Sequence, residues 1–390
     1  MIYRLSDKYL DFPNPEEAEE DGLIAVGGDL SVERLAVAYL SGIFPWYVDP
    51  DEGPVWYSLD PRMVLMPEDF KYSHSLQRLV QSGKFHVKCD TDFEGVIRQC
   101  GAVAREDEEG TWISDDMRQA YIELHRRGLA HSFETYYEGR LVGGLYGVSM
   151  GEMFSGESMF HLVSNASKVA FAALVAFCRN HEFHYIDAQQ PTGHLASLGA
   201  EPIPRRRFLE MVNDLTPRNT LFGKWHANRV VLLIGGNQGD RVGLLREAVA
   251  EIGRRIGPVN CSSMIYETAP WGFEAEQNFL NMALSVDTNL TPREVLREAL
   301  EIEARLGRVR KGQGYASRPM DIDIILYNDR KINEPDLVVP HPRMHLRRFV
   351  LRPLCDIMPE YVHPILKKTL LELLEECPDE GKVEIFATEK

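Results

Sequence analysis

The sequence has 390 residues, 44% hydrophobic and 26% charged, which excludes a wholly disordered chain and, at about 150 residues per domain, predicts two or three domains. Its net charge of −16 is uneven: residues 1–225 hold 21 Lys and Arg against 34 Asp and Glu, which discourages nonspecific nucleic-acid binding, whereas residues 226–390 hold 22 against 25. The sequence shows no secretory signal, membrane-spanning run or C-x-x-C pair, so we expect a cytoplasmic protein without a membrane partner, a disulfide scaffold or a zinc ribbon.

The first half of the chain has the pattern of a mixed α+β domain. Residues 1–70 are rich in Gly, Pro and Trp and only weakly periodic. Apolar residues recur at helical spacing over 117–129 and 166–177, and residues 132–159 between them alternate like a hairpin. A strand at 183–186 and a helix at 205–212 are also expected.

A domain boundary is predicted where short, polar, Pro-containing sequence around residues 216–228 precedes a β-branched run closed by Gly235 and Gly236. We therefore expect domains at 1–225 and 226–390. The second half alternates between strand and helix patterns, which is typical of a compact α/β sandwich. Its expected strands are 230–234, 279–286 and 320–327, and its expected helices are 242–256, 292–306 and 366–377.

The strongest chemical signal in the second half is the D-x-D pair Asp321 and Asp323. In a strand, residues two apart share a face, so both carboxylates should lie about 6–7 Å apart and bind a Mg²⁺ ion that also holds phosphate oxygens. A solvent-facing acidic edge fits a bare D-x-D equally well. Flanking arginines favour the metal site because guanidinium groups pair with phosphate, and the sequence has no P-loop.

Several motifs of this half, in order, resemble 6-hydroxymethyl-7,8-dihydropterin pyrophosphokinase of folate biosynthesis: G-G-N-Q-G-D-R, E-T-A-P-W-G, R-P-M-D-I-D-I-I-L and V-P-H-P. The resemblance implies a ferredoxin-like α/β sandwich that moves pyrophosphate from ATP to the pterin hydroxymethyl group. It makes Asp321 and Asp323 ligands of two Mg²⁺ ions, with Arg310 and Arg318 also acting in catalysis. The implied ATP contacts are Glu303, Arg308, Arg310, Arg318, His341 and Arg347, and the implied pterin contacts are Thr268, Pro270, Trp271, Phe279, Asn281 and Phe349.

Chemical signals in the first half are weaker: the G-x-S-x-G string at 147–151 lies inside the expected hairpin, where it does not form the strand-to-helix elbow of a nucleophilic serine, and there is no metal-ligand cluster. Trp46 and Trp112 lie in Gly/Pro contexts, where base stacking and simple packing both fit. Asp187 and Gln189 follow a strand at i and i+2, so we expect them to share a face and to orient a reacting amine, or else to be a satisfied pair at the strand end.

The first half is nevertheless similar in ordered motifs to leucyl/phenylalanyl-tRNA–protein transferase: G-I-F-P-W, E-G-T-W-I, F-S-G-E-S-M-F, I-D-A-Q and H-L-A-S-L-G-A. The resemblance implies an acetyltransferase-like (GNAT) fold with a small N-terminal subdomain. It implies transfer of Leu or Phe from Leu-tRNA or Phe-tRNA to proteins with N-terminal Lys or Arg, an N-degron reaction without a cofactor. Trp46, Trp112, Leu145, Met159 and Leu174 would bind the aminoacyl-tRNA, while Asp187, Gln189 and Glu157 would act in catalysis.

Two further expectations follow from that resemblance. Arg205, Arg206 and Arg207 are the best candidate contacts with tRNA in an otherwise acidic half. The alternative function is that the first half is a non-catalytic tRNA- or peptide-binding module attached to an active pyrophosphokinase.

Overall fold

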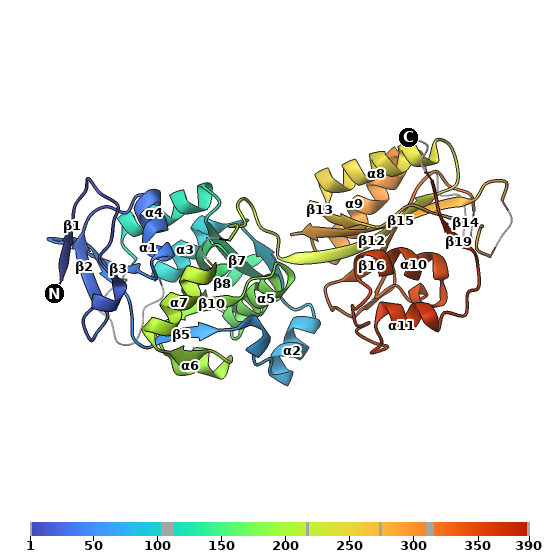
Figure 1. Cartoon of the computed structure of the whole chain (residues 1–390). Coiled ribbons are helices and arrows are strands. Elements are labelled where there is room, and N and C mark those ends of the chain that lie inside the picture. The colour runs from blue at the N-terminus through green and yellow to red at the C-terminus, as the bar shows by residue number, and fades with distance from the viewer. Residues whose placement is uncertain (1, 103–112, 216–217, 273–274, 309–315, 388–390) are drawn as a thin grey trace. The chain divides into compact units, whose positions relative to one another are not determined.

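The computed structural model of this chain describes residues 2–102, 113–215, 218–272, 275–308 and 316–387 (Figure 1). It divides into two compact units, Met1–Ala227 and Asn228–Lys390. Across the described residues, no helix has the length and apolar character needed to cross a membrane. Both units mix strands and helices, so the α/β class expected for a two-domain chain is confirmed at that level.

The first unit contains two sheets. The smaller has the strand order β1-β2-β4-β3 and the larger β11-β5-β10-β9-β8-β7-β6. The strands are β1 (Tyr3–Leu5), β2 (Leu23–Gly27), β3 (Phe44–Asp49), β4 (Gly53–Tyr57), β5 (Arg62–Leu65), β6 (His86–Cys89), β7 (Ala130–Tyr137), β8 (Arg140–Met150), β9 (Met153–His161), β10 (Tyr185–Gln189) and β11 (Glu201–Ile203). The helices are α1 (Val32–Leu40), α2 (His74–Gln81), α3 (Phe93–Ala102), α4 (Asp115–Arg126), α5 (Ala166–Asn180), α6 (Gly193–Ser197) and α7 (Arg205–Leu215), with 3-10 turns η1 (Pro15–Glu17) and η2 (Pro67–Asp69).

Helices cover both faces of the larger sheet. Tyr146 and Val148 of β8 pack on one face with α1, α3 and α4, in a core that also includes Trp56 of the small sheet. Leu145 of the same strand packs on the other face against α5. Most of α5 is buried, which fits a helix whose apolar residues continue around its circumference.

The last residues before the unit boundary belong to the core of the first unit. The Trp225 ring stacks on His131, with ring centroids 3.6 Å apart, and on Phe177, at 4.2 Å. Its backbone N–H donates to Asp90 Oδ2 at 2.8 Å. Only 2% of Trp225 is exposed, so residues beyond the expected helix at 205–212 complete this core.

The second unit has one sheet in the order β16-β12-β15-β14-β19, with β13 also paired to β15, and a separate two-stranded sheet of β17 and β18. Its strands are β12 (Asn228–Gly236), β13 (Val259–Ser262), β14 (Tyr266–Thr268), β15 (Phe279–Thr288), β16 (Asp321–Tyr327), β17 (Ile332–Glu334), β18 (Leu337–Val339) and β19 (Val383–Ile385). Its helices are α8 (Arg241–Arg255), α9 (Pro292–Arg305), α10 (Arg348–Ile357) and α11 (Leu370–Glu375), with the 3-10 turn η3 (Met344–Leu346).

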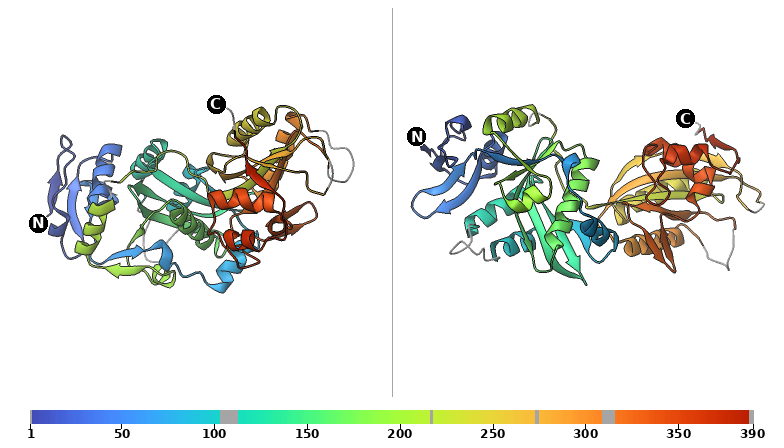
Figure 2. Two further views of the ribbon diagram at one scale, coloured as in Figure 1. Left: turned by 45° about the vertical axis from the view of Figure 1, so that its right-hand side comes forward. Right: turned by 90° about the horizontal axis from the view of Figure 1, so that it is seen from below.

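Alternation along β12 explains the layers of this unit. Val230, Leu232 and Ile234 pack against α8 and α9. Val231 and Leu233 point to the opposite face, which α10 and α11 cover. The two helix pairs therefore lie on opposite sides of the sheet (Figure 2). Within one strand, therefore, alternate residues can point into the apolar core under α8 and α9, while the residues between them point toward α10 and α11.

The helix expected at 366–377 is shorter than predicted. Thr369 caps it with a reciprocal capping box to Glu372, so the helix begins at Leu370. Lys367 before it has a positive φ of 60°, and the backbone N–H of Leu366 donates to His363 Nδ1. Leu366 therefore belongs to an exposed turn ahead of the helix, where its apolar side chain does not join the core.

Candidate active sites

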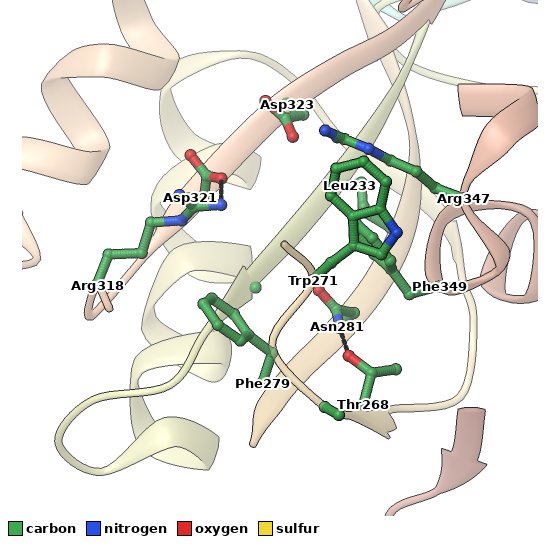
Figure 3. Close-up of a pocket in the computed structure, with 12 residues that line it drawn as sticks. Leu233, Thr268, Trp271, Phe279, Asn281, Arg318, Asp321, Asp323, Arg347 and Phe349 are labelled. Atoms are coloured by element: carbon green, nitrogen blue, oxygen red, sulfur yellow. Dashed lines mark hydrogen bonds and ion pairs between the residues drawn. The ribbon is translucent and has the colours of Figure 1, made fainter. Parts of the chain in front are cut away.

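A cavity of about 50 Å³ lies on the α10 side of the sheet in the second unit (Figure 3). We call it the carboxylate pocket. Asp321 and Asp323 lie at one end of it and the Asn281 amide with Thr268 at the other, while Trp271 lies between them beside Arg347. Its lining residues are Leu233, Gly235, Thr268, Ala269, Trp271, Phe279, Asn281, Arg318, Asp321, Asp323, Arg347 and Phe349.

Both predicted metal ligands face this pocket because they alternate with Ile322 and Ile324, which pack in the core on the α8 side. Arg318 pairs with Asp321 at 2.5 Å. In the described residues, no Lys or Arg forms an ion pair with Asp323, and burial followed by the charge of Asp321 raises the pKa of this carboxyl to about 7. A pair of hard oxygen ligands of this kind fits Mg²⁺, which would relieve their repulsion.

The opposite end of the pocket is built for a flat polar ring. Asn281 Nδ2 donates to Thr268 Oγ1 at 2.8 Å, which fixes the amide plane and leaves its oxygen and second N–H to face the pocket. Gly235 makes room for this amide, since a Cβ there would lie 2.6 Å from Asn281 Oδ1. Arg347 lies over the Trp271 ring at 4.7 Å, so aromatic surface and positive charge meet on one wall.

Four of the residues expected to contact ATP or pterin do not line this pocket: Pro270, Glu303, Arg308 and His341. Glu303 is buried behind β16, where its Oε1 accepts the Ile322 N–H at 2.9 Å and an Arg308 N–H at 2.6 Å. It therefore supports the start of the strand that carries both carboxylates. Burial, then the charges of Arg347 and Arg343, lowers the pKa of His341 to about 4. Arg310 lies outside the described residues.

A second cavity, of about 380 Å³, lies in the first unit, and we call it the apolar pocket. Trp46, Leu145, Met159 and Leu174, all expected to bind aminoacyl-tRNA, line it. Trp112 lies outside the described residues. The other lining residues are Phe44, Pro45, Tyr146, Phe154, Gly156, Glu157, Ser158, Phe171, Ile186, Ala188, Gln189, Gln190, Thr192, His194 and Leu195.

Glu157 is the acidic group of the apolar pocket, and three side chains hold it. Gln189 Nε2 donates to its Oε1 at 2.9 Å, the Tyr39 hydroxyl lies 2.7 Å from Oε1, and the Tyr121 hydroxyl lies 2.8 Å from Oε2. Burial is the main reason that the pKa of Glu157 is raised to about 7. Sequence reasoning missed both tyrosines, because they come from α1 and α4 and no local pattern links them to β9.

Asp187 lies behind the pocket instead of lining it. Its carboxylate accepts two hydrogen bonds from Arg62, from Nε at 2.8 Å and from Nη2 at 2.6 Å, and both side chains are 1% exposed. The expectation that Asp187 and Gln189 share a face is wrong, because a bulge interrupts β10 between them and gives Gln189 a φ of 57°. Asp187 Oδ1 accepts the Gln189 N–H at 3.0 Å, so it fixes the backbone that aims Gln189 at Glu157.

The arginine run at the start of α7 is not one exposed basic patch. Arg205 is only 7% exposed, and its Nη1 donates to the Pro15 carbonyl at 3.1 Å. Arg206 and Arg207 are exposed, but both pair with Glu210. The expected tRNA contact at Arg205 is therefore corrected to an anchor between α7 and η1.

Comparison with known proteins matches the two units to two different families. Residues 28–60 match the model of the leucyl/phenylalanyl-tRNA protein transferase N-terminal domain, and residues 64–213 match that of leucyl/phenylalanyl-tRNA protein transferase. Residues 231–359 match the model of 7,8-dihydro-6-hydroxymethylpterin-pyrophosphokinase (HPPK).

Whole-protein relatives support the first of these matches. The chain is 52% identical over 225 residues to the leucyl/phenylalanyl-tRNA–protein transferase of Solidesulfovibrio magneticus, covering 57% of this chain and 90% of that protein. It is 52% identical over 207 residues to the enzyme of the same name from Dechloromonas aromatica, covering 53% of this chain and 88% of that protein.

Among solved structures, the Plasmodium falciparum HPPK-DHPS wild type with SDX-DHP is similar at 20% identity and a TM-score of 0.32. The match covers 38% of this chain and 43% of that one, so this chain spans less than half the length of that protein.

Proposed function

The chain belongs through its first unit to the leucyl/phenylalanyl-tRNA–protein transferase family, and we propose that the apolar pocket is where that unit transfers leucine or phenylalanine from tRNA to protein. The observation that carries this proposal is a largely apolar cavity whose polar edge includes the hydrogen-bonded pair Glu157 and Gln189. An apolar side chain of the donor fits the cavity, while its ester and the attacking amine meet the polar edge.

The proposal gives roles to residues that line the apolar pocket and to two residues outside its lining, Trp112 and Asp187. Leu145, Met159 and Leu174 take the donor side chain, and Trp46, with Trp112, stacks on the terminal adenosine. Gln189 and Glu157 position the N-terminal amine of an acceptor that begins with Lys or Arg, and Asp187 positions Gln189. The aminoacyl ester is already activated and the amine has a pKa of about 7.7–8.0, so no protein nucleophile is needed.

The test supplies the purified chain with labelled Leu-tRNA or Phe-tRNA and a peptide beginning with Arg. We expect transfer by the parental chain and at least a tenfold loss in Ala188→Phe, which adds a ring to the pocket wall, with ATP-dependent activity of the second unit unchanged. No transfer by the parental chain at low salt would favour the alternative, a tRNA- or peptide-binding module.

The second unit is an HPPK domain, which transfers pyrophosphate from ATP to 6-hydroxymethyl-7,8-dihydropterin, and we propose that the carboxylate pocket is its active site. Asn281 and Thr268 read the polar edge of the pterin, while Trp271 and Phe349 stack on its ring. Arg318 and Arg347 lie beside the carboxylates, where they hold phosphate oxygens in line with the pterin hydroxyl, and Arg308 and Arg310 add positive charge.

Asp321 and Asp323 would hold magnesium with the ATP phosphates, two ions in our proposal. The metal, when bound, supplies charge neutralisation for the departing AMP. In Asp323→Asn we expect at least a hundredfold loss of AMP formation and a higher Mg²⁺ requirement, with aminoacyl transfer unaffected. Parental rates at low Mg²⁺ in this variant would remove Asp323 from the metal site.

The finer architecture and setting are part of the same proposal. We assign a GNAT-like fold with a small N-terminal subdomain to residues 1–225 and a ferredoxin-like sandwich to 226–390, on the strand and helix order of each unit. Aminoacyl-tRNA and ATP are found in the cytoplasm. Their location supports our proposal of a cytoplasmic enzyme that acts both in N-degron tagging and in folate biosynthesis.

A further inference from the structure

Three oxygen-bearing side chains from separate elements meet beside the apolar pocket, and we call them the Glu157 ring. The Tyr39 and Tyr121 hydroxyls lie 2.7 Å apart, Tyr39 lies 2.7 Å from Glu157 Oε1, and Tyr121 lies 2.8 Å from Glu157 Oε2. Their exposed fractions are 2%, 0% and 8%. Every edge of this triangle has the length of a hydrogen bond between two oxygens.

Three such contacts need three protons, one on each edge. Each tyrosine hydroxyl carries one proton, and an ionised carboxylate carries none. Both phenols keep their protons, because burial and the neighbouring Glu157 raise the pKa of Tyr39 and Tyr121. The third proton must therefore belong to Glu157.

One direction around the ring satisfies every group. Gln189 Nε2 donates to Oε1, so Oε1 is the carbonyl oxygen and the acid proton sits on Oε2. Oε2–H then donates to Tyr121, Tyr121 donates to Tyr39, and Tyr39 donates to Oε1. The other charged groups that act on Glu157 are Asp187, which favours the neutral acid, and Arg62, which opposes it, and these two pair with each other.

Building on the proposed transfer reaction, we propose that Glu157 is a neutral acid in the resting site and acts as general acid toward the 3′-oxygen of the terminal adenosine, with Tyr39 and Tyr121 as positioning residues. The acceptor amine attacks the ester carbon, so a C–N bond forms and the C–O bond to the ribose breaks. The leaving oxygen takes the Glu157 proton, and the proton lost by the new amide nitrogen returns to the carboxylate. Burial places the pKa of Glu157 near the pH at which both transfers are possible.

The first test looks for the proton itself. Infrared spectra at pH 6 should contain a protonated-carboxyl carbonyl band that Glu157→Gln removes. Glu134 is a second buried carboxyl outside this pocket, so Glu134→Gln is the matched control and should leave the Glu157 band in place. Glutamine mimics the neutral acid, donating to Tyr121 and accepting from Tyr39 and Gln189. Glu157→Gln should therefore match the parental urea midpoint at pH 4.5 and exceed it at pH 8, whereas an ionised resting Glu157 predicts no lost band and a lower midpoint at pH 8.

The second test distinguishes loss of the general acid from a change in the geometry of the site. With Phe-tRNA, Glu157→Gln should lower kcat by about 10²–10⁴-fold, the usual range for a general acid. With a phenylalanyl p-nitrophenyl ester, whose leaving group needs no proton, the loss should be under about tenfold by the same reasoning. Equal losses with both donors would overturn the acid role. Absence of transfer by the parental chain from both donors would count against the transfer function, and the infrared result would still decide the resting proton.

Discussion

The buried ion pair between Arg62 and Asp187 predicts that removing either charge destabilises the first unit. The Arg62 guanidinium lies 4.6 Å from the Phe44 ring and 4.6 Å from the Phe208 ring, so it cannot reach solvent without opening the core. Removing one partner of such a pair costs about 3–5 kcal/mol, because the other charge stays buried and unpaired. Since a domain is stable by only about 5–15 kcal/mol, Asp187→Ala should lose a large share of the stability of this unit.

Urea unfolding at pH 7 measures this loss, with kinase activity reporting separately on the second unit. The matched control is Arg218 with Glu152, an ion pair of the same 2.6 Å distance whose side chains are 46% and 25% exposed. Arg218→Ala should cost under about 1 kcal/mol. The double replacement Arg62→Met with Asp187→Leu should recover most of the stability lost in Asp187→Ala, because no charge remains buried.

The reasoning is refuted if Asp187→Ala unfolds at the same urea concentration as the exposed control. If the prediction holds, lost transfer in Asp187→Ala reports on folding as well as on chemistry. The double variant then shows whether a folded site without Asp187 still orients Gln189 for transfer.

Three further predictions concern other parts of the chain. Burial raises the pKa of Glu134 to about 7. The neutral Glu134 carboxyl therefore contributes its full stability below pH about 4.5, and that contribution is lost as pH rises through 7. Glu134→Gln should reduce the difference between the free energies of unfolding in urea at pH 5 and pH 8 by about 2 kcal/mol. Gly235→Ala should weaken pterin binding at least tenfold in calorimetry by displacing Asn281, whereas Gly253→Ala, where a Cβ meets no described atom within 4 Å, should leave it unchanged. Trp225→Ala should cost the first unit about 3–5 kcal/mol in urea unfolding, and a cost under 1 kcal/mol would show that this ring is not part of its core.

The sequence predicted the position of a side chain correctly where that position depends only on neighbouring residues in the chain. Asp321 and Asp323 face one pocket because their strand pairs regularly with β12 over residues 321–324, so simple alternation placed them together. The same rule failed at Asp187 and Gln189, where a bulge reverses the second side chain. The residues of β10 alone do not predict this bulge, because the bulge arises in the pairing with β5, a strand more than 120 residues earlier in the chain.

The groups that sequence reasoning missed share one property. Tyr39 and Tyr121 reach Glu157 across 118 and 36 residues of chain, and Arg62 reaches Asp187 across 125. Each contact forms only when separate helices and strands pack, so no short motif encodes it. Chemistry that rests on such contacts becomes visible only in the folded unit.

The placement of Trp225 has a consequence for the order in which the chain matures during synthesis. A nascent chain folds its N-terminal domain first, as residues emerge at about 5–20 per second. Because Trp225 stacks on His131 and Phe177 in the first core, the packing of that core stays incomplete until Trp225, three residues ahead of β12, has emerged. A ribosome that stalls shortly before this point would hold a nearly full-length transferase unit with an open core, exposed to chaperones and proteases.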